Sequence, residues 1–123
     1  MKFKDLLTGF IRLHILHHAA EHEIYGQWMI EELARHGYRL SPGTLYPLLH
    51  GMEKKGYLRS RKQHPGRTAR TLYRATPLGK RGLALAKSRV LEFTGEAMKD
   101  QAGRLSEFPL SKPVKGTLSA GSN

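Results

Sequence analysis

One run of the sequence, residues 40–57, most strongly constrains the fold of this chain. Ser41 followed by Pro42 is typical of a helix start, because the Ser hydroxyl can accept a bond from a first-turn N–H and Pro needs no donor there. Apolar residues then recur at helical spacing, and Gly56 is expected to end the helix. These apolar residues lie along one side of the predicted helix, and we expect that side to face a core. They are Leu45, Leu48, Leu49 and Met52.

The opposite side of this predicted helix carries small, aromatic and hydrogen-bonding residues and no acid. Such a surface favours contact with another molecule. Pro47 removes one intrahelical hydrogen bond, so we expect a slightly irregular first turn. The face comprises Gly43, Tyr46, Pro47, His50 and Lys54.

Two short strands are predicted next, at residues 57–61 and 71–75, joined by a turn that contains Pro65-Gly66 together with Arg67 and Arg70. Another helix is predicted before the central one, at residues 25–36, and Gly37 is expected to end it. Helix, turn, helix and basic hairpin is the order of a winged helix-turn-helix, whose second helix enters the major groove of DNA. The expected fold is therefore mainly α with a small β-hairpin.

The same residues resemble the PadR family of bacterial transcriptional regulators. The resemblance rests on Leu-Ser-Pro-Gly-Thr-Leu-Tyr-Pro-Leu-Leu-His at 40–50, Glu-Lys-Lys-Gly-Tyr-Leu at 53–58 and Leu-Tyr-Arg-Ala-Thr-Pro-Leu-Gly at 72–79. It implies a homodimeric winged-helix repressor with dimer contacts in the terminal helices, and it places Ser41, Gly43, Thr44, Tyr46 and Pro47 at the DNA surface. Two pairs, Gly26-Gln27 and Leu72-Tyr73, depart from the Gly-Tyr and Tyr-Tyr of many members. The short C-terminal part is similar to the single-helix branch of the family.

The formal net charge is +11, and its distribution is one-sided. Between Lys54 and Arg89 the chain has twelve Lys or Arg and no Asp or Glu. Such a field attracts polyanions, of which nucleic acid is the commonest and an anionic membrane surface the next. A solvated basic surface without a partner is the remaining interpretation.

Composition limits the other classes of function. Without Cys there is no disulfide, thiolate nucleophile or zinc-thiolate site, which suits a cytoplasmic location. Asp5, Arg12 and three His interrupt the apolar N-terminal segment, so we expect neither a secretory signal nor a membrane span. No Ser-His-Asp arrangement, phosphate-binding Gly loop or pair of acids favours an enzyme. We expect no catalytic residue, cofactor or metal.

Two terminal helices are predicted, at residues 5–20 and 77–102. The first is apolar on nearly every side, which in so short a chain predicts burial against a second subunit. The second begins after Thr76-Pro77 and carries a short heptad seam. We expect a DNA-binding domain at 1–76, a dimerisation helix at 77–102 and a disordered tail at 103–123. The expected interface residues are Phe10, Leu13, Leu83, Ala86, Val90, Phe93 and Ala97.

Histidines at helical spacing mark the first helix, namely His14, His17, His18 and His22. One interpretation is a metal site built from His14, His18 and His22, but polar residues that close a buried helix are the preferred explanation. Trp28 is expected to pack in the core or at an interface, with stacking on an aromatic effector as the alternative. In the helix at 25–36, Glu31, Glu32 and Arg35 are expected to face water.

The expected function is a sequence-specific, DNA-binding transcriptional regulator, a homodimeric repressor on an inverted-repeat operator that a small-molecule effector releases. His50 and Lys54 are expected at base edges, and Arg67 and Arg70 in the minor groove. Phosphate contacts are expected from the hydroxyls of Ser41, Thr44 and Tyr46. For Thr44 a helix cap, and for Tyr46 packing against the preceding helix, remain the alternatives. The alternative function is a sequence-nonspecific nucleic-acid-binding or protein-interaction winged-helix protein.

Overall fold

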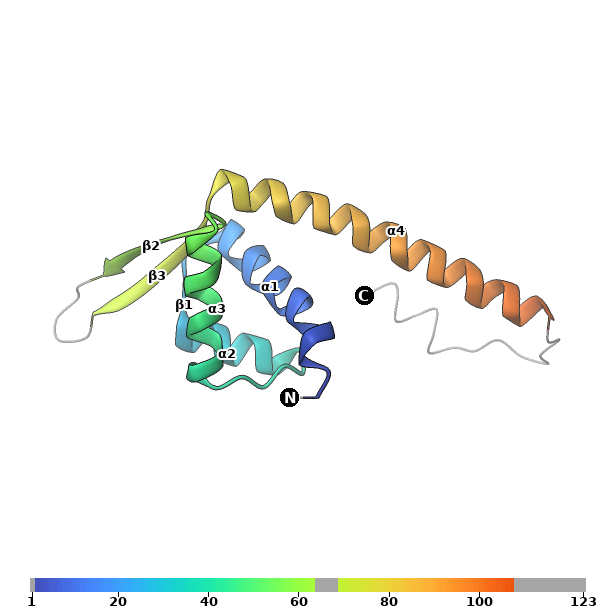
Figure 1. Cartoon of the computed structure of the whole chain (residues 1–123), viewed down its shortest axis with the longest axis horizontal. Coiled ribbons are helices and arrows are strands. Elements are labelled where there is room, and N and C mark those ends of the chain that lie inside the picture. The colour runs from blue at the N-terminus through green and yellow to red at the C-terminus, as the bar shows by residue number, and fades with distance from the viewer. Residues whose placement is uncertain (1, 64–68, 108–123) are drawn as a thin grey trace. The chain divides into compact units, whose positions relative to one another are not determined.

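A computed structural model describes residues 2–63 and 69–107 of the chain, the last four of these by backbone alone. Helices dominate, and a small antiparallel sheet completes the fold (Figure 1). The elements are α1 (Lys4–Glu21), β1 (Ile24–Tyr25), α2 (Gly26–Arg35), α3 (Pro42–Lys54), β2 (Leu58–Gln63), β3 (Arg70–Ala75) and α4 (Pro77–Glu107).

The sheet has the strand order β1-β3-β2. Strands β2 and β3 pair from Leu58↔Ala75 to Gln63↔Arg70, and β1 adds two residues on the other edge of β3. The β2–β3 hairpin projects away from α1, α2 and α3 as a wing (Figure 1). The two predicted strands are confirmed, each slightly longer than expected, whereas β1 was not predicted because two residues carry no detectable alternation.

One core joins α1, α2, α3 and the base of the sheet. Its centre is fully enclosed, because Ile15, Met29, Leu33, Leu45 and Leu49 are each 0% exposed. The apolar stripe predicted for α3 therefore faces the core, with Met52 also buried and Leu48 partly buried.

Both predicted glycine stops are confirmed. Gly37 and Gly56 have φ angles of 89° and 86°, a left-handed conformation that favours glycine. After α3, the N–H of Gly56 donates to the Glu53 carbonyl and that of Tyr57 to the Met52 carbonyl, both at 2.9 Å. This is the Schellman ending of a helix, and it turns the chain sharply from α3 into β2.

The start of α4 belongs to the same compact unit as the other elements. Thr76 Oγ1 accepts a 3.0 Å bond from the N–H of Gly79, so the predicted cap is present. A Cβ on Gly79 would lie 2.2 Å from the Tyr57 carbonyl oxygen, and Leu83 is 7% exposed within the core. The N-terminal unit therefore extends to Lys87, past the border expected at residue 76.

The far end of α4 also differs from expectation. The helix continues to Glu107, so residues 103–107, assigned to a disordered tail from sequence, are helical. The rest of that predicted tail, residues 108–123, lies outside the described residues. None of the described helices combines the length and apolar content needed to cross a membrane.

Two expectations for α1 and α2 need correction. Ile11, Ile15, Leu16 and Ala19 are buried within the chain itself, so the burial of these side chains does not require a second subunit. The side chain of Glu32, expected in water, is only 13% exposed because it turns toward α1.

Trp28 packs in the way that sequence reasoning preferred. Its side chain is partly buried against the core, and its ring lies 5.2 Å from both the His18 and the His22 rings.

Candidate nucleic-acid interface

The outer face of α3 is open to solvent in the way its sequence predicted. Because Leu45, Leu49 and Met52 anchor the helix in the core, Gly43, Pro47, His50 and Lys54 lie on the exposed side. The helix runs without interruption through Pro47. Small residues near its start leave the backbone accessible, while the imidazole of His50 and the ammonium of Lys54 extend the donor surface along its length.

Ser41 does not cap α3 with its side chain, so that prediction was wrong. Its carbonyl oxygen accepts 3.0 Å bonds from the N–H groups of Thr44 and Leu45, and its hydroxyl donates to Thr44 Oγ1 at 3.4 Å. The Thr44 hydroxyl therefore lies next to that of Ser41 at the start of α3. An uncapped helix N-terminus with two hydroxyls beside it is suited to a phosphate oxygen.

Tyr46 is held between α3 and α2. It is partly buried, and its hydroxyl oxygen lies 2.2 Å from the position that a Cβ on Gly26 would occupy. Only glycine at position 26 leaves space for this ring. Tyr46 therefore packs against the preceding helix, the alternative considered from sequence, while its ring stays 6.4 Å from that of the exposed His50.

Tyr46 also lines a hollow of about 370 Å³ between α2, α3 and the wing. Arg70, at the start of β3, lines the same hollow, and its guanidinium carbon lies 4.4 Å from the centre of the Tyr25 ring. Two residues expected to contact DNA, one from the helix and one from the wing, thus lie on one continuous surface. The lining residues are Tyr25, Gly26, Gln27, Tyr46, Ala69, Arg70 and Thr71.

Four exposed arginines share one face of the wing. Arg59 lies directly opposite Arg74, and Arg61 and Arg70 follow on the same side of the ribbon because strand residues alternate. We call Arg59, Arg61, Arg70 and Arg74 the basic wing face. Sequence reasoning counted these residues as charge but chose only Arg70 for the interface, although 59 and 61 have strand spacing. Arg67 lies outside the described residues.

One acidic residue, Glu23, partly neutralises the positive charge of the basic wing face. Both oxygens of Glu23 accept bonds from Arg61, at 2.6 and 2.7 Å. Hydrogen bonding to Arg61 holds the pKa of Glu23 below its usual value, and the charge of Arg74 acts in the same direction. The pair ties β2 to the chain just before β1, so it orients the wing.

A second carboxylate joins the wing to α3. Glu53 Oε2 accepts bonds from the backbone N–H of Ser60 at 3.0 Å and from its hydroxyl at 2.7 Å. Tyr73 lies behind this contact, where burial and then the Glu53 charge raise the pKa of its phenol. Glu53 therefore fixes β2 relative to the exposed face of α3.

The residues expected at a dimer interface fall into two groups. Within the N-terminal unit, Phe10 is 47% exposed, whereas Leu83 is buried in the chain's own core, which argues against an interface role for Leu83. In the later part of α4, Val90 and Phe93 are 36% and 63% exposed. Leu13 and Ala86 are partly buried and Ala97 is exposed.

Comparison with known proteins identifies the family. The family model described as "Transcriptional regulator PadR-like family" matches residues 15–85. The transcriptional regulator Rv3488 of Mycobacterium tuberculosis is 48% identical over 99 residues, which cover 80% of this chain and 92% of that protein.

Solved structures have the same fold. A PadR family transcriptional regulator from Eggerthella lenta is 32% identical, with a TM-score of 0.61, over 85% of this chain and 88% of that one. A PadR-like transcription factor from Bacteroides fragilis, 20% identical with a TM-score of 0.70 over 78% of this chain and 94% of its own, supports the fold alone. The chain therefore belongs to the PadR-like family of transcriptional regulators, which are DNA-binding proteins and not enzymes.

Proposed function

We propose that this regulator is a homodimeric repressor that binds an inverted-repeat operator, with α3 in the major groove and the wing on the adjacent backbone. Two observations carry the proposal, namely the direct pairing of the exposed residues Arg59 and Arg74 in the wing and the exposed, acid-free outer face of α3. Like charges opposite each other destabilise a sheet, and an anionic partner removes that cost. DNA phosphates on both sides of a groove are such a partner.

Specificity and affinity come from different residues in this proposal. His50 and Lys54, exposed along α3, contact base edges, where an ammonium or an imidazole N–H can donate to guanine acceptors. Ser41 and Thr44 bind a phosphate at the start of α3. Gly43 and Pro47 allow close approach, and Tyr46 contributes its ring edge while it holds α3 against α2.

Affinity is then supplied by the basic wing face, which includes Arg70, together with Arg67, which lies outside the described residues. Each neutralised phosphate adds about −0.9 to the slope of log affinity against log salt. A dimer that contacts about six to eight phosphates is therefore strongly sensitive to salt.

The dimer is proposed because apolar side chains stay exposed in the single chain. Phe10 in α1 is one of them, and Val90, Phe93 and Ala97 on α4 are others. Removing such apolar surface from water favours association. A two-fold pair presents its two α3 helices about 34 Å apart, one turn of DNA, which requires an inverted repeat.

Repression follows when the operator overlaps a promoter in the cytoplasm. A small-molecule effector would release the protein by binding better to a dimer whose α3 helices are wrongly spaced.

The proposal is tested with a duplex recovered from a random pool by the wild-type protein. His50→Ala and Lys54→Ala should each weaken binding to this duplex by about 1–3 kcal/mol and relax sequence preference, because both remove a base contact. Arg74→Ala should weaken binding to every sequence and reduce the salt slope by about 1. Arg12→Ala, an exposed arginine on α1, is the control and should bind normally. Unchanged affinity in all three test variants would refute the docking.

The alternative is a sequence-nonspecific binder on the same fold. A specific repressor keeps its operator in a large excess of random duplex at physiological salt, whereas a nonspecific protein is competed away.

A further inference from the structure

A second cluster of polar side chains lies between α1 and the end of α2, and the DNA proposal does not use it. His14 and His18 lie one turn apart on α1, and His36 follows the last residue of α2. One ring nitrogen of each of these three histidines lies within 4.8 Å of the others. Sequence spacing suggested His22 as the third member, but its Nδ1 contacts the carbonyl of Glu23 instead.

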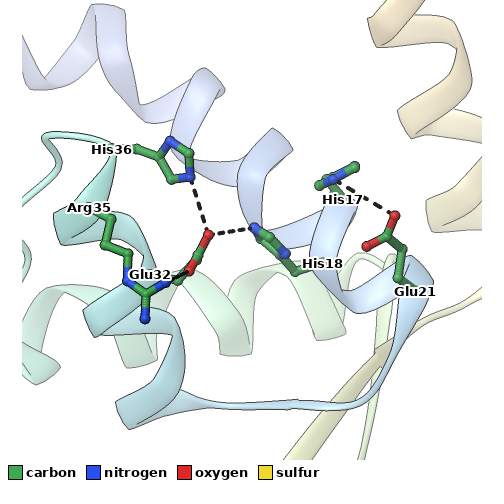
Figure 2. A network of polar contacts seen from close by, with 6 residues as sticks. All are labelled: His17, His18, Glu21, Glu32, Arg35 and His36. Atoms are coloured by element: carbon green, nitrogen blue, oxygen red, sulfur yellow. Dashed lines mark hydrogen bonds and ion pairs between the residues drawn. The ribbon is translucent and has the colours of Figure 1, made fainter. Parts of the chain in front are cut away.

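A carboxylate, that of Glu32, lies next to the histidine cluster. Glu32 Oε2 lies 3.4 Å from His18 Nε2 and 3.2 Å from His36 Nε2, so it points between the two rings (Figure 2). Its other oxygen is 3.5 Å from Arg35 Nη1. Sequence reasoning placed Glu32 in water and therefore did not assign it to this cluster. In the structure, the largely buried carboxylate of Glu32 lies close to the imidazoles of the cluster.

The rings are held in place by their neighbours. The His14 ring lies 4.6 Å from the His36 ring and 5.5 Å from that of Tyr38, and the His18 ring meets Trp28 edge-on at 5.2 Å. Such packing orients the donor atoms before any ligand arrives, which lowers the cost of binding.

The electrostatics also suit ligand atoms. Burial, followed by the neighbouring His36, lowers the pKa of His14, and burial lowers the pKa of His18 despite the opposing charge of Glu32. A lowered pKa favours the neutral imidazole, which is the form that binds a metal. A purely structural role would explain why Glu32 contacts His18 and His36. It would not explain why a nitrogen of His14 lies within 4.8 Å of nitrogens of both His18 and His36.

We propose that His14, His18 and His36 bind a divalent transition-metal ion such as Zn²⁺, while Glu32 orients the rings of His18 and His36. Zinc favours four ligands in a tetrahedron with bonds of about 2.0–2.1 Å, whose edges are about 3.3 Å. The three histidine nitrogens lie within 4.8 Å of one another, so side-chain rotation brings them to that spacing, and a water molecule supplies the fourth ligand. Imidazole ligands suit zinc and its neighbours in the transition series, whereas Mg²⁺ and Ca²⁺ prefer oxygen ligands.

Binding would connect α1 to the last turn of α2, immediately before the Gly37 turn that leads to α3. The site is independent of the proposed operator, because no ligand belongs to the face of α3 or to the wing.

The test is calorimetric titration of zinc chloride into the full-length chain after removal of metal with a chelator. We expect one ion per chain. His36→Ala should lower the affinity by at least about tenfold, because loss of a ligand costs no less than loss of an outer-shell partner. This variant is chosen because the His36 side chain is 46% exposed, so its loss should leave the fold intact. The control is His22→Ala, an exposed histidine of the same segment, and should bind as the wild type does.

A competing group shares His18 and consists of His17, His18 and Glu21, all within 4.8 Å (Figure 2). His17→Ala separates the two groups. Normal affinity in His17→Ala with loss in His36→Ala supports the proposal, whereas the reverse pattern overturns it. Circular dichroism of each variant checks that it is folded.

The visible absorption of bound Co²⁺ tests the site in the wild-type protein. A tetrahedral site produces intense visible absorption on Co²⁺ loading, and zinc should abolish that absorption by displacement. Absence of a tetrahedral Co²⁺ spectrum, or no heat of zinc binding by the wild type, would overturn the proposal.

Discussion

The contact between Tyr46 and Gly26 leads to a quantitative prediction. In Gly26→Ala the new Cβ would lie 2.2 Å from Tyr46 Oη, 2.4 Å from Cζ and 2.7 Å from Cε1. All three distances are shorter than any tolerated contact, so either the ring or α2 must move. Overpacking of this kind destabilises a protein by about 1–3 kcal/mol. The better helix propensity of Ala returns at most about 1 kcal/mol.

A double-mutant cycle isolates this contact. In a Tyr46→Ala background the obstacle is gone, so Gly26→Ala should be neutral or slightly stabilising, and the coupling free energy should be about 1–3 kcal/mol. The control is Gly51→Ala, also in a helix but with no atom within 4 Å of its new Cβ. It should stabilise the protein by about 0.5–1 kcal/mol.

The assay is urea unfolding at one fixed protein concentration, because the stability of a dimer depends on concentration. If Gly26→Ala costs the same free energy with and without the Tyr46 ring, the packing role of Tyr46 is wrong.

Three further predictions concern the wing and the dimer. Glu53→Ala should lower the free energy of unfolding by about 1.5–3 kcal/mol, because it removes two bonds from Ser60 to a charged group; unchanged urea unfolding would contradict this. Arg61→Ala should raise the pKa of Glu23 toward its ordinary value, as followed by NMR titration. Since Arg61 lowers that pKa in the folded state, the stabilisation is present above the unfolded pKa and lost as pH falls through the folded one; an unmoved pKa would refute the pairing. Phe93→Glu should raise the dimer dissociation constant at least about tenfold in sedimentation, since it places a charge in an apolar contact, and Lys99→Glu should not.

Local sequence patterns predicted helix positions well but not the atoms that make each end. Ser41-Pro42 and Thr76-Pro77 are the same signature, and both mark helix starts. Only Thr76 uses its side chain as a cap, because Ser41 donates its hydroxyl to Thr44 instead. Whether such a hydroxyl caps its helix depends on the side-chain rotamer, which the residue types alone do not determine.

Contacts between elements were harder to predict from sequence. Helical spacing joined His22 to His14 and His18, but the third histidine of the cluster comes from the end of α2. Heptad spacing likewise placed Leu83 in a dimer seam, although the first turns of α4 pack into the chain's own core. Spacing within one helix defines a face, and only the fold decides what covers it.

The basic wing face could be predicted from the sequence only in part. Arg59 and Arg61 have the alternation of a strand, but their pairing with Arg74 and Arg70 depends on the register between β2 and β3. The residue pattern between the two predicted strands does not determine this register.

The most direct measurement is the selection of bound duplexes from a random DNA pool at physiological salt. The account predicts an enriched inverted repeat whose half-sites are about one helical turn apart, and its enrichment should be lost in His50→Ala/Lys54→Ala. A pool without an enriched motif, or a motif without two-fold symmetry, would contradict the claim that two copies of α3 read one operator.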